Sequence, residues 1–439
     1  MTNDISRREF LKRTSFGIGV GAAALEALEA EEAAAQIRPP SANEKINVGL
    51  VGCGGMGMGN MGAAVATGMA NVVALCDVDA KHLAGAQSRY PSAKGYHDYR
   101  DLIANKNVEV VCVSTPDHWH AIPTITACQA GKDVYCEKPL AHNVVESADM
   151  VKAARKYNRV VNGGTQQRTD PHFIRAVEIV QSGLLGRITF CRTWNVSNED
   201  GMGTPIIGNP PPGLDYDFWL GPAPKREYNS HRCHFTFRWF YDYAGGMITD
   251  WGVHLNDIVL WGMKSGLPKS VSAVGGKYCI PDDRDTPDTQ YVSYDMEGGG
   301  NNAYPYTLVY EMRKQNGRHT DGADYGIEFY GTNGTLRVDR GGFSLYPEKG
   351  RIPAQQSSGN DDKVPHWRNF LTCVKTRRRP ASDVEITHIS TVTCLLGNVS
   401  LRSGRKIWFD PEKMVCTGDQ NATELLRRVY RKPYLLPKV

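Results

Sequence analysis

The chain has 439 residues, of which 41% are hydrophobic and 22% charged, and its net charge is +4 at pH 7. This composition is typical of a globular protein, and the length suits two domains preceded by a leader. The sequence contains no basic block or aromatic-interleaved basic stripe, which argues against a nucleic acid as partner. No apolar run reaches the roughly 18 residues that predict a membrane-spanning helix.

Residues 1–40 have the pattern of a targeting segment. Ser6–Lys12 reads S-R-R-E-F-L-K, which resembles the signal of the twin-arginine export system. An apolar run, Phe16–Leu25, and the small residues Ala33–Ala35 follow, although the glutamates between positions 26 and 32 make this region unusually acidic. We therefore expect a twin-arginine signal and linker here, and export to the periplasm. If the signal is not functional, the protein remains cytoplasmic.

The 11 cysteines do not form a disulfide framework, because their number is odd and no C-x-x-C pair occurs. Cys76, Cys112 and Cys136 fall in predicted strands, where a cysteine behaves as a small hydrophobic residue. Free buried thiols are compatible with twin-arginine export, since that system moves proteins that have already folded in the reducing cytosol.

Residues 41–165 alternate short apolar runs with helical patterns. This alternation predicts a doubly wound parallel sheet, that is, a Rossmann domain. The predicted strands are 46–51, 71–76, 108–113, 132–136 and 159–162, and the predicted helices include 57–68, a segment ending at 128, and 144–157.

Residues 166–439 show a different pattern, in which strands follow one another with fewer helices between them. We expect a second domain of the α+β class with a large, open and mostly antiparallel sheet. Its predicted strands are 187–196, 270–279, 289–296, 305–313, 324–330 and 334–338, and amphipathic helices are predicted near 366–376 and 384–402.

A glycine-rich turn follows the first predicted strand and opens the first helix, with the sequence G-C-G-G-M-G. In this context the pattern predicts a dinucleotide site. Gly52 would allow the tight turn, Gly54 would let the backbone approach a pyrophosphate, and Gly57 would let helix and strand pack closely. The backbone N–H groups of the helix start, including those of Gly55 and Met56, would face the phosphates.

Asp77 ends the second predicted strand, 20 residues after Gly57. An acidic residue at this position accepts hydrogen bonds from ribose hydroxyls. Because its carboxylate would repel a 2′-phosphate, we expect NAD as the cofactor in preference to NADP.

The strand that ends at Val113 is followed by S-T-P-D-H-W-H. Ligands of parallel sheets bind at the carboxyl ends of the strands, so Thr115, Pro116 and His120 are candidates for contact with the dinucleotide. The same residues could form an N-terminal helix cap, with Thr115 or Asp117 as the capping group, and the two roles are compatible.

Glu137-Lys138-Pro139 follows the next predicted strand. A lysine at this position can place its ammonium group beside a substrate hydroxyl. Alone, the motif could equally be a surface lysine before a turn proline.

A second motif favours the catalytic interpretation of Lys138. Asp250 and His254 are four residues apart in a predicted helix and would share one face. A carboxylate beside an imidazole can orient it as a general base. The pair could instead be structural or part of a metal site, but no H-E-x-x-H motif and no third ligand is evident, so we expect no metal.

Taken together, these motifs resemble the glucose–fructose oxidoreductase and inositol dehydrogenase family, known as Gfo/Idh/MocA, and in particular its exported members. The resemblance spans about residues 50–257 and includes Gln166-Gln167-Arg168. It implies a Rossmann domain and an open-faced α/β domain that often forms homo-oligomers through its sheet. It also implies that Lys138, Asp250 and His254 lie in the active site, that Glu137 contacts the cofactor, and that Arg168 lies near the substrate. The Pro/Gly-rich stretch from Trp194 to Pro224 shows no family pattern, and we expect it to border the pocket.

The predicted function is hydride transfer between a nicotinamide cofactor and a secondary alcohol or ketone of a sugar, polyol or glycoside. His254 would accept the hydroxyl proton, Asp250 would orient His254, and Lys138 would stabilise charge on the oxygen. Two alternatives remain open at this point. One is an NAD-dependent glycosidase or lyase that acts by transient oxidation and elimination, and the other is a non-catalytic module that senses NAD or sugar.

Overall fold

The first half of the folded chain forms the expected parallel sheet. The structure is a computed structural model that describes residues 44–320 and 322–439, so the predicted export signal lies outside the described residues. Six strands pair in the order β3-β2-β1-β4-β5-β6, all in parallel. The strands are β1 (Ile46–Val51), β2 (Ala70–Cys76), β3 (Lys94–Tyr96), β4 (Val110–Val113), β5 (Asp133–Cys136) and β6 (Val161–Gly163).

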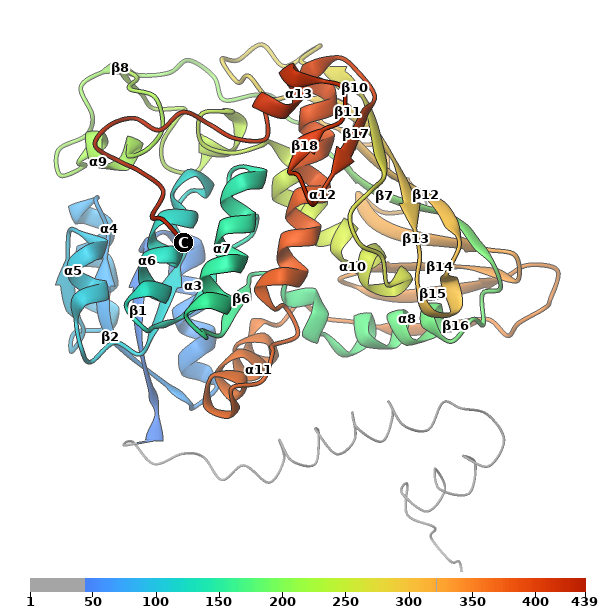
Figure 1. Ribbon diagram of the computed structural model, residues 1–439, viewed down its shortest axis with the longest axis horizontal. Helices are drawn as coiled ribbons and strands as arrows, with labels where there is room; N and C mark the ends of the chain where they lie inside the picture. Colours follow the sequence, from blue (N-terminus) through green and yellow to red (C-terminus); the bar gives the residue numbers. More distant parts are fainter. Residues whose placement is uncertain (1–43, 321) are drawn as a thin grey trace, which may run out of the picture. The chain divides into compact units, whose positions relative to one another are not determined.

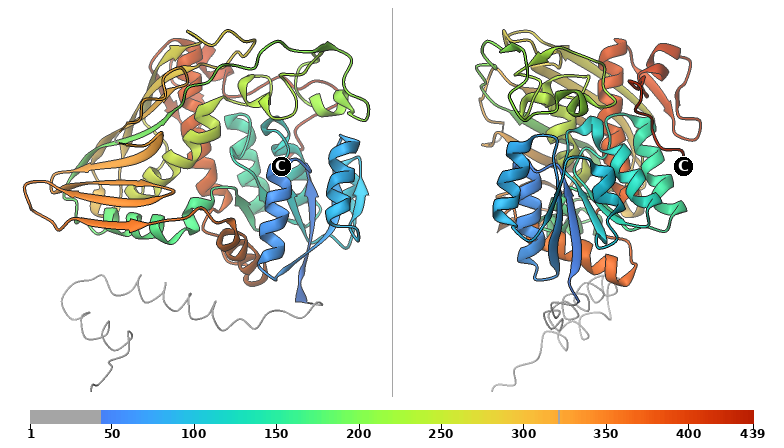
Figure 2. Two further views of the ribbon diagram at one scale, coloured as in Figure 1. Left: turned by 180° about the vertical axis from the view of Figure 1, so that it is seen from behind. Right: turned by 90° about the vertical axis from the view of Figure 1, so that its left-hand side faces the viewer.

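Helices connect these strands and cover both faces of the sheet, as a doubly wound fold requires (Figures 1 and 2). Several of them begin at a side chain that caps the first turn: Asp79 accepts a hydrogen bond from the backbone of Lys81, and Asn143 from that of Glu146. The helices are α3 (Gly55–Ala66), α4 (Ala80–Arg89), α5 (Tyr99–Ala104), the 3-10 turn η2 (Asp117–Trp119), α6 (Ala121–Gln129) and α7 (Val144–Lys156).

The second half forms a larger, mostly antiparallel sheet, which confirms the predicted fold class. Ten strands pair in the order β16-β15-β14-β13-β7-β12-β11-β10-β17-β18, and only the β12–β7 pair is parallel. The strands are β7 (Ile188–Val196), β10 (Ser270–Gly276), β11 (Thr289–Glu297), β12 (Pro305–Arg313), β13 (Tyr325–Gly331), β14 (Gly334–Asp339), β15 (Gly342–Pro347), β16 (Gln355–Ser358), β17 (Ile407–Asp410) and β18 (Val415–Cys416).

The other elements of this half are helices, short turns and a two-stranded ribbon. The ribbon consists of β8 (Ile207–Gly208) and β9 (Tyr228–Asn229). The helices and turns are η3 (Gln166–Thr169), α8 (Pro171–Gln181), α9 (Tyr216–Leu220), η4 (Thr236–Trp239), the π-helical turn η5 (Ile248–Gly252), α10 (Val253–Met263), η6 (Gly300–Asn302), α11 (Lys363–Thr376), α12 (Val384–Ser403) and α13 (Gln420–Glu424). None of the described helices is long and apolar enough to cross a membrane.

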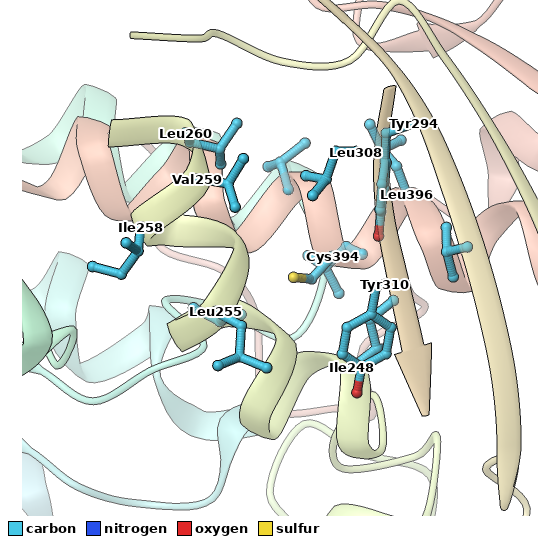
Figure 3. Packing of buried hydrophobic residues seen from close by; sticks show 14 of the residues in the cluster. Ile248, Leu255, Ile258, Val259, Leu260, Tyr294, Leu308, Tyr310, Cys394 and Leu396 are labelled. Atoms are coloured by element: carbon cyan, nitrogen blue, oxygen red, sulfur yellow. The ribbon is translucent and has the colours of Figure 1, made fainter. Parts of the chain in front are cut away.

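The main core lies between one face of the large sheet and the helices α10 and α12. Figure 3 shows Cys394 of α12 near Tyr294 and Tyr310 of the sheet, with Leu255 on the neighbouring α10 and Ile258 on the far side of that helix. All five side chains are inaccessible to solvent. Helix α12 also packs against α7 of the first half, so it contacts both halves of the fold (Figure 1).

Helix α11 comes from the C-terminal part of the sequence but packs on the first sheet, beside α3. The Trp367 ring stacks on that of Tyr135 in β5, with ring centroids 4.4 Å apart. Trp367, Phe370 and Leu371 are fully buried in the core on this face of the parallel sheet. The half that contains the parallel sheet is therefore completed by a helix that begins 200 positions beyond its last strand, from Gly163 to Lys363.

Candidate active site

A cleft of about 420 Å³ lies at the carboxyl ends of the parallel strands. Its lining includes the predicted glycine turn, Asp77, the Thr115–His120 segment, Glu137, Lys138 and Asp250. These residues come from β1, β2, β4, β5 and η5, so the fold gathers motifs that are far apart in the sequence. Among the predicted site residues, Gly57, His254 and Arg168 do not line this cleft.

The three glycines of the turn have the environments that their predicted roles require. Gly52 has a φ of +95°, and a Cβ there would lie 2.6 Å from the Ser114 carbonyl oxygen. A Cβ on Gly57 would lie 2.0 Å from the carbonyl oxygen of Gly52, so helix and strand could not pack as they do. At Gly54 and Gly55, by contrast, a Cβ would meet nothing within 4 Å, because both positions face the open cleft.

These features fit a dinucleotide. The α3 helix begins at Gly54 without a side-chain cap, so the first N–H groups of the helix are available to an anion. The buried hydroxyl of Thr115 also lines the cleft and has no hydrogen-bond partner within the described residues. An open glycine surface, an uncapped helix start and an unpaired buried hydroxyl are what a bound pyrophosphate and ribose would use.

The Asp77 carboxylate is held by the backbone beside the glycine turn. Its Oδ2 accepts a hydrogen bond from Cys53 N at 2.7 Å, and its Oδ1 accepts one from Asp79 N at 2.9 Å. The side chain lines the cleft and remains partly accessible. Asp77 therefore both fixes the turn and presents a carboxylate to a ligand.

His120 and Glu137 line the cleft but are engaged with the protein itself. The two ring nitrogens of His120 lie 2.8 Å from the Thr115 carbonyl oxygen and 2.7 Å from that of Pro139. The Glu137 carboxylate accepts hydrogen bonds from the Asn60 side chain and from the backbone N–H of Lys138. His120 thus connects the loops that carry Thr115 and Lys138, and Glu137 fixes the start of the lysine loop.

Lys138 is the centre of a charged group at the other end of the cleft. Its ammonium donates to Asp250 Oδ1 at 2.6 Å and to the Asp250 carbonyl oxygen at 2.9 Å. The second carboxylate oxygen of Asp250 accepts from Arg238 Nη1 at 2.7 Å. Burial disfavours the ionised carboxylate, but the charges of Lys138 and Arg238 outweigh that effect and hold the pKa of Asp250 below its usual range.

Asp250, predicted to orient His254, interacts with it through charge. Within the described residues no hydrogen bond joins the two side chains, since Asp250 is bound to Lys138 and Arg238 instead. The physical reason is competition for the carboxylate, because Lys138 and Arg238 bring full positive charges to both of its oxygens. Sequence spacing alone does not reveal such competing partners.

His254 is nevertheless a neutral imidazole close to this charged group. Its side chain is buried, and Nδ1 has no hydrogen-bond partner among the described residues. Burial, together with the positive charges of Lys138 and Arg340, lowers the pKa of His254 well below its ordinary value. An uncharged imidazole in this position can accept a proton.

Arg168, which the resemblance places near the substrate, does not line the cleft. Arg168 forms a buried bidentate ion pair with Asp257 of α10, with nitrogen–oxygen distances of 2.6 and 3.0 Å. The guanidinium lies over the Trp261 ring, 5.1 Å from its centroid. Arg168 therefore ties η3 to α10, and its charge does not face the cleft. A residue five positions past a strand end, such as Arg168 after β6, can turn into the core as readily as into a site.

Sequence reasoning missed several residues that shape the cleft. Arg238 completes the Lys138–Asp250 group, and Asp117 lines the cleft close to the same charges. Burial raises the pKa of Asp117 to about 8. Phe218 and Trp219 also line the cleft, as expected for the border of the Pro/Gly-rich stretch, and so do Phe235 and Phe237. The many aromatic residues between positions 216 and 240 are the sequence feature that could have indicated a lining of the cleft.

Comparison with known proteins identifies the family. Residues 46–165 match the Gfo/Idh/MocA oxidoreductase family, NAD-binding Rossmann fold, and residues 189–274 and 345–436 match the C-terminal α/β domain of the same family. The chain belongs to the Gfo/Idh/MocA family. The second match is discontinuous. Its two segments leave out strands β11 to β14 of the large sheet, which lie between them in the sequence.

Two curated relatives illustrate the sequence similarity. The inositol 2-dehydrogenase of Salmonella typhimurium is 34% identical over 166 residues, which are 36% of this chain and 49% of that enzyme. The levoglucosan dehydrogenase of Pseudarthrobacter phenanthrenivorans is 31% identical over 165 residues, 35% of this chain and 42% of that enzyme. The chain thus spans about half the length of the curated relatives that it matches.

Solved structures resemble this Gfo/Idh/MocA chain over a greater length. Levoglucosan dehydrogenase in complex with NADH and levoglucosan superimposes with a TM-score of 0.65 at 19% identity, and the match covers 83% of this chain and 99% of that one. The WlbA dehydrogenase of Bordetella pertussis in complex with NADH and UDP-GlcNAcA gives a TM-score of 0.62 at 20% identity, with the same coverage of both chains. At these identities the similarity establishes the fold.

Proposed function

We propose that this protein is an NAD-dependent oxidoreductase that acts on a secondary alcohol or ketone of a sugar, polyol or glycoside. One observation carries the proposal: the Lys138–Asp250 ion pair and the glycine turn line the same cleft. A dinucleotide bound along the cleft from the glycine turn would place its nicotinamide end next to Lys138. In this part of the described cleft, the group of Lys138, Asp250 and Arg238 is the one that could hold a reacting oxygen.

The proposed roles follow from the contacts. The Lys138 ammonium donates to the substrate oxygen and stabilises negative charge on it. Asp250, held by Arg238, keeps the Lys138 ammonium in place. The carbon that bears the hydroxyl gives up a hydride, and the hydroxyl proton passes to neutral His254. Because His254 does not line the cleft itself, this step requires a substrate that reaches beyond Lys138. When bound, NAD supplies the hydride acceptor, and ketone reduction uses the same side chains in reverse.

NAD is proposed over NADP because of the charge beside the turn. Asp77 presents a carboxylate where the adenosine ribose would lie, and Asp79 adds a second negative charge two residues later. A 2′-phosphate would approach both carboxylates, which costs electrostatic free energy at short range. Titration of the purified protein with NAD and with NADP tests this preference, and equal or tighter NADP binding would contradict it.

The class of substrate is proposed from the family and the relatives. Inositol and levoglucosan, named in the relatives described above, are respectively a cyclic polyol and an anhydro sugar. Aromatic side chains such as Phe218, Trp219 and Phe235 line the cleft and could stack on the apolar face of a sugar ring.

Replacement of Lys138 tests the proposed chemistry. Lys138→Met keeps the length of the side chain and removes the ammonium, so turnover on a responsive sugar or polyol should fall by roughly a hundredfold or more. Affinity for NAD should change little, because the dinucleotide contacts lie at the other end of the cleft. Stopped-flow turnover and fluorescence titration of NAD measure the two quantities.

A carbohydrate panel with wild-type protein should be assayed both for NADH formation and for glycoside cleavage. Lys413→Met is a suitable control, since Lys413 is exposed and paired only with Asp410 within its own turn. If Lys138→Met retained normal turnover, the proposed role of the lysine would be removed. Glycoside cleavage without net NADH formation would favour transient oxidation and elimination instead.

We also propose export through the twin-arginine system, on the basis of the S-R-R-E-F-L-K motif at Ser6–Lys12. Replacing Arg7 and Arg8 by Lys should shift the protein from the periplasmic to the cytosolic fraction. Cell fractionation and immunoblotting provide the measurement, and an unchanged distribution between the fractions would contradict the proposal.

A further inference from the structure

A cluster of three potential metal ligands lies at the end of the cleft that is remote from Lys138. Asp79, His82 and His234 each offer one ligand atom, and these atoms lie within 4.8 Å of one another. We propose that they form a binding site for one divalent transition-metal ion, with Zn²⁺ as the best match. The proposal uses none of the residues assigned to proton and hydride transfer, but it shares Asp77 and Asp79 with the proposed preference for NAD.

The backbone of α4 holds the first two ligands in position. Asp79 is the N-cap of the helix, and its Oδ1 accepts a hydrogen bond from Lys81 N at 2.8 Å. His82 follows three residues later, so the two side chains share one face of the first turn. Because the capping bond occupies Oδ1, Oδ2 of Asp79 is the oxygen that remains for a ligand.

The third ligand comes from the other half of the protein. His234 lies 155 positions after Asp79, just before η4, and its Nε2 is 2.9 Å from Asp79 Oδ2. The rings of His82 and His234 are also close, with centroids 4.3 Å apart. A tetrahedral zinc ion has bonds to nitrogen and oxygen of about 2.0–2.2 Å, which place its ligand atoms about 3.3–3.6 Å apart. Small side-chain rotations would bring all three atoms to these bond lengths.

A second carboxylate is placed to orient one of the imidazoles. Asp77 Oδ2 lies 3.7 Å from His82 Nδ1. A carboxylate that contacts the far nitrogen of a metal-binding histidine fixes the ring and increases its basicity. With Nδ1 directed to Asp77, Nε2 of His82 is the nitrogen that would bind the ion.

The composition and accessibility of the cluster suggest which ion would bind. Two imidazoles and one carboxylate suit zinc and its transition-metal neighbours, whereas magnesium and calcium prefer oxygen ligands alone. The side chains of Asp79, His82 and His234 are 12%, 32% and 35% exposed, so an ion can reach them from solvent. Three protein ligands leave a fourth position for water or for a group of a bound ligand.

The consequence would be a cross-link between the two halves of the fold at the mouth of the cleft. This edge is already joined by backbone hydrogen bonds, from Ala80 N to the Gly213 carbonyl oxygen and from Asp215 N to the Val78 carbonyl oxygen. A metal ion bound to α4 and to His234 would add a strong bond across the same junction. Metal binding should therefore stabilise the folded protein.

Equilibrium dialysis of the purified, NAD-free protein against Zn²⁺ tests the proposal. Wild-type protein should bind one equivalent tightly, and His82→Ala, His234→Ala and Asp79→Asn should each weaken binding by at least about tenfold. Co²⁺ bound in place of zinc should give the visible absorption of a tetrahedral site. The melting temperature should rise with added Zn²⁺ in wild type but not in the variants.

His97→Ala is the matched control. His97 lines the same cleft and also contacts an aspartate, with Nε2 3.3 Å from Asp215 Oδ2, but it belongs to no cluster of three metal-ligand side chains among the described residues. Its replacement should leave zinc binding unchanged. The proposal is overturned if wild type binds zinc no more tightly than the His82→Ala/His234→Ala double variant, or if His97→Ala weakens binding as much as His234→Ala does.

Discussion

At the scale of single residues, the active cleft is dominated by the balance between burial and charge. Asp250 stays ionised in a buried position because two cations contact its two oxygens. His254 stays neutral because it is buried near cations that oppose its protonation. Asp117, which lies in the same environment without such direct contacts, has its pKa raised instead. Neighbouring titratable groups are thus pushed toward different protonation states, as acid–base sites require.

Asp117 gives a prediction about stability and pH. Burial, reinforced by Asp250 and opposed by Lys138 and Arg238, raises its pKa to about 8. The folded protein therefore keeps a proton that the unfolded chain loses near pH 4, so this carboxyl lowers stability progressively as the pH rises to about 8, after which its effect is constant. Asp117→Asn removes the titration. The melting temperature of Asp117→Asn minus that of wild type should be larger at about pH 8 than at about pH 5.

Differential scanning fluorimetry across this pH range measures the effect. Asp149→Asn is a suitable control, because Asp149 is a half-buried surface partner of the exposed Lys152 on α7 and should give a curve parallel to that of wild type. Parallel curves for Asp117→Asn and wild type would show that Asp117 is ionised throughout.

At the scale of elements, the site depends on how the first strand passes into its helix. Gly52, Gly54 and Gly57 look equivalent in the sequence, but a side chain would meet very different surroundings at each position. Asp250 lies in the π-helical turn before α10, and its two oxygens accept hydrogen bonds from Lys138 and Arg238. The charged partners within reach, and not residue spacing alone, decide which groups meet.

Alanine substitutions in the glycine turn should separate folding from binding. Gly57→Ala places a Cβ 2.0 Å from a backbone oxygen and should destabilise the protein by about 1–3 kcal/mol, the usual cost of overpacking. Gly54→Ala meets no atom within 4 Å and should leave stability nearly unchanged. It should still weaken NAD binding by about tenfold or more, because the methyl group occupies the path of the pyrophosphate.

Chemical denaturation and NAD titration of the two variants provide the measurements. Gly68→Ala would not be a clean control, since its φ of +75° disfavours a side chain, whereas Gly85→Ala on α4 meets nothing within 4 Å and has no such constraint. Normal NAD affinity in Gly54→Ala would place the pyrophosphate elsewhere.

At the scale of the whole molecule, the two halves depend on each other. Helix α11 supplies part of the core of the parallel sheet, and α12 packs against elements of both halves. The charged group of the cleft likewise combines Lys138 from the first half with Arg238 and Asp250 from the second. Neither half alone contains a complete site.

The large sheet has one covered and one open face, which leads to a prediction about assembly. Val274 of β10 and Tyr291 of β11 lie opposite each other, and Trp408 of β17 is on the same face; all three are exposed. Apolar side chains gathered on one exposed surface are typical of an interface. We therefore expect a homo-oligomer in which this face of the sheet is buried, and Tyr291→Glu combined with Trp408→Glu should yield monomers.

Size-exclusion chromatography with light scattering determines the assembly state. Val429→Glu serves as the control, because Val429 is 90% exposed and lies outside the sheet. A wild-type protein that is monomeric at micromolar concentration would contradict the expectation, as would a double variant that keeps its oligomeric state.

The sequence by itself determined the alternation of strands and helices, the fold class and the glycine turn with its acidic residue. These features are local, because hydrophobic periodicity and backbone sterics act over a few neighbouring residues. From these local features the sequence predicted that Gly52, Gly54, Asp77 and Lys138 follow the carboxyl ends of parallel strands, and in the structure these residues line the cleft.

Only the tertiary structure decided which charged groups meet. Arg168 turned into the core to pair with Asp257, Asp250 bound Lys138 and Arg238, and His234 came to lie 2.9 Å from Asp79. Each of these pairs except Arg238–Asp250 joins residues at least 89 positions apart, and no local pattern encodes such distances. A charged side chain takes the partner that best offsets its desolvation, and that partner is known only once the chain has folded.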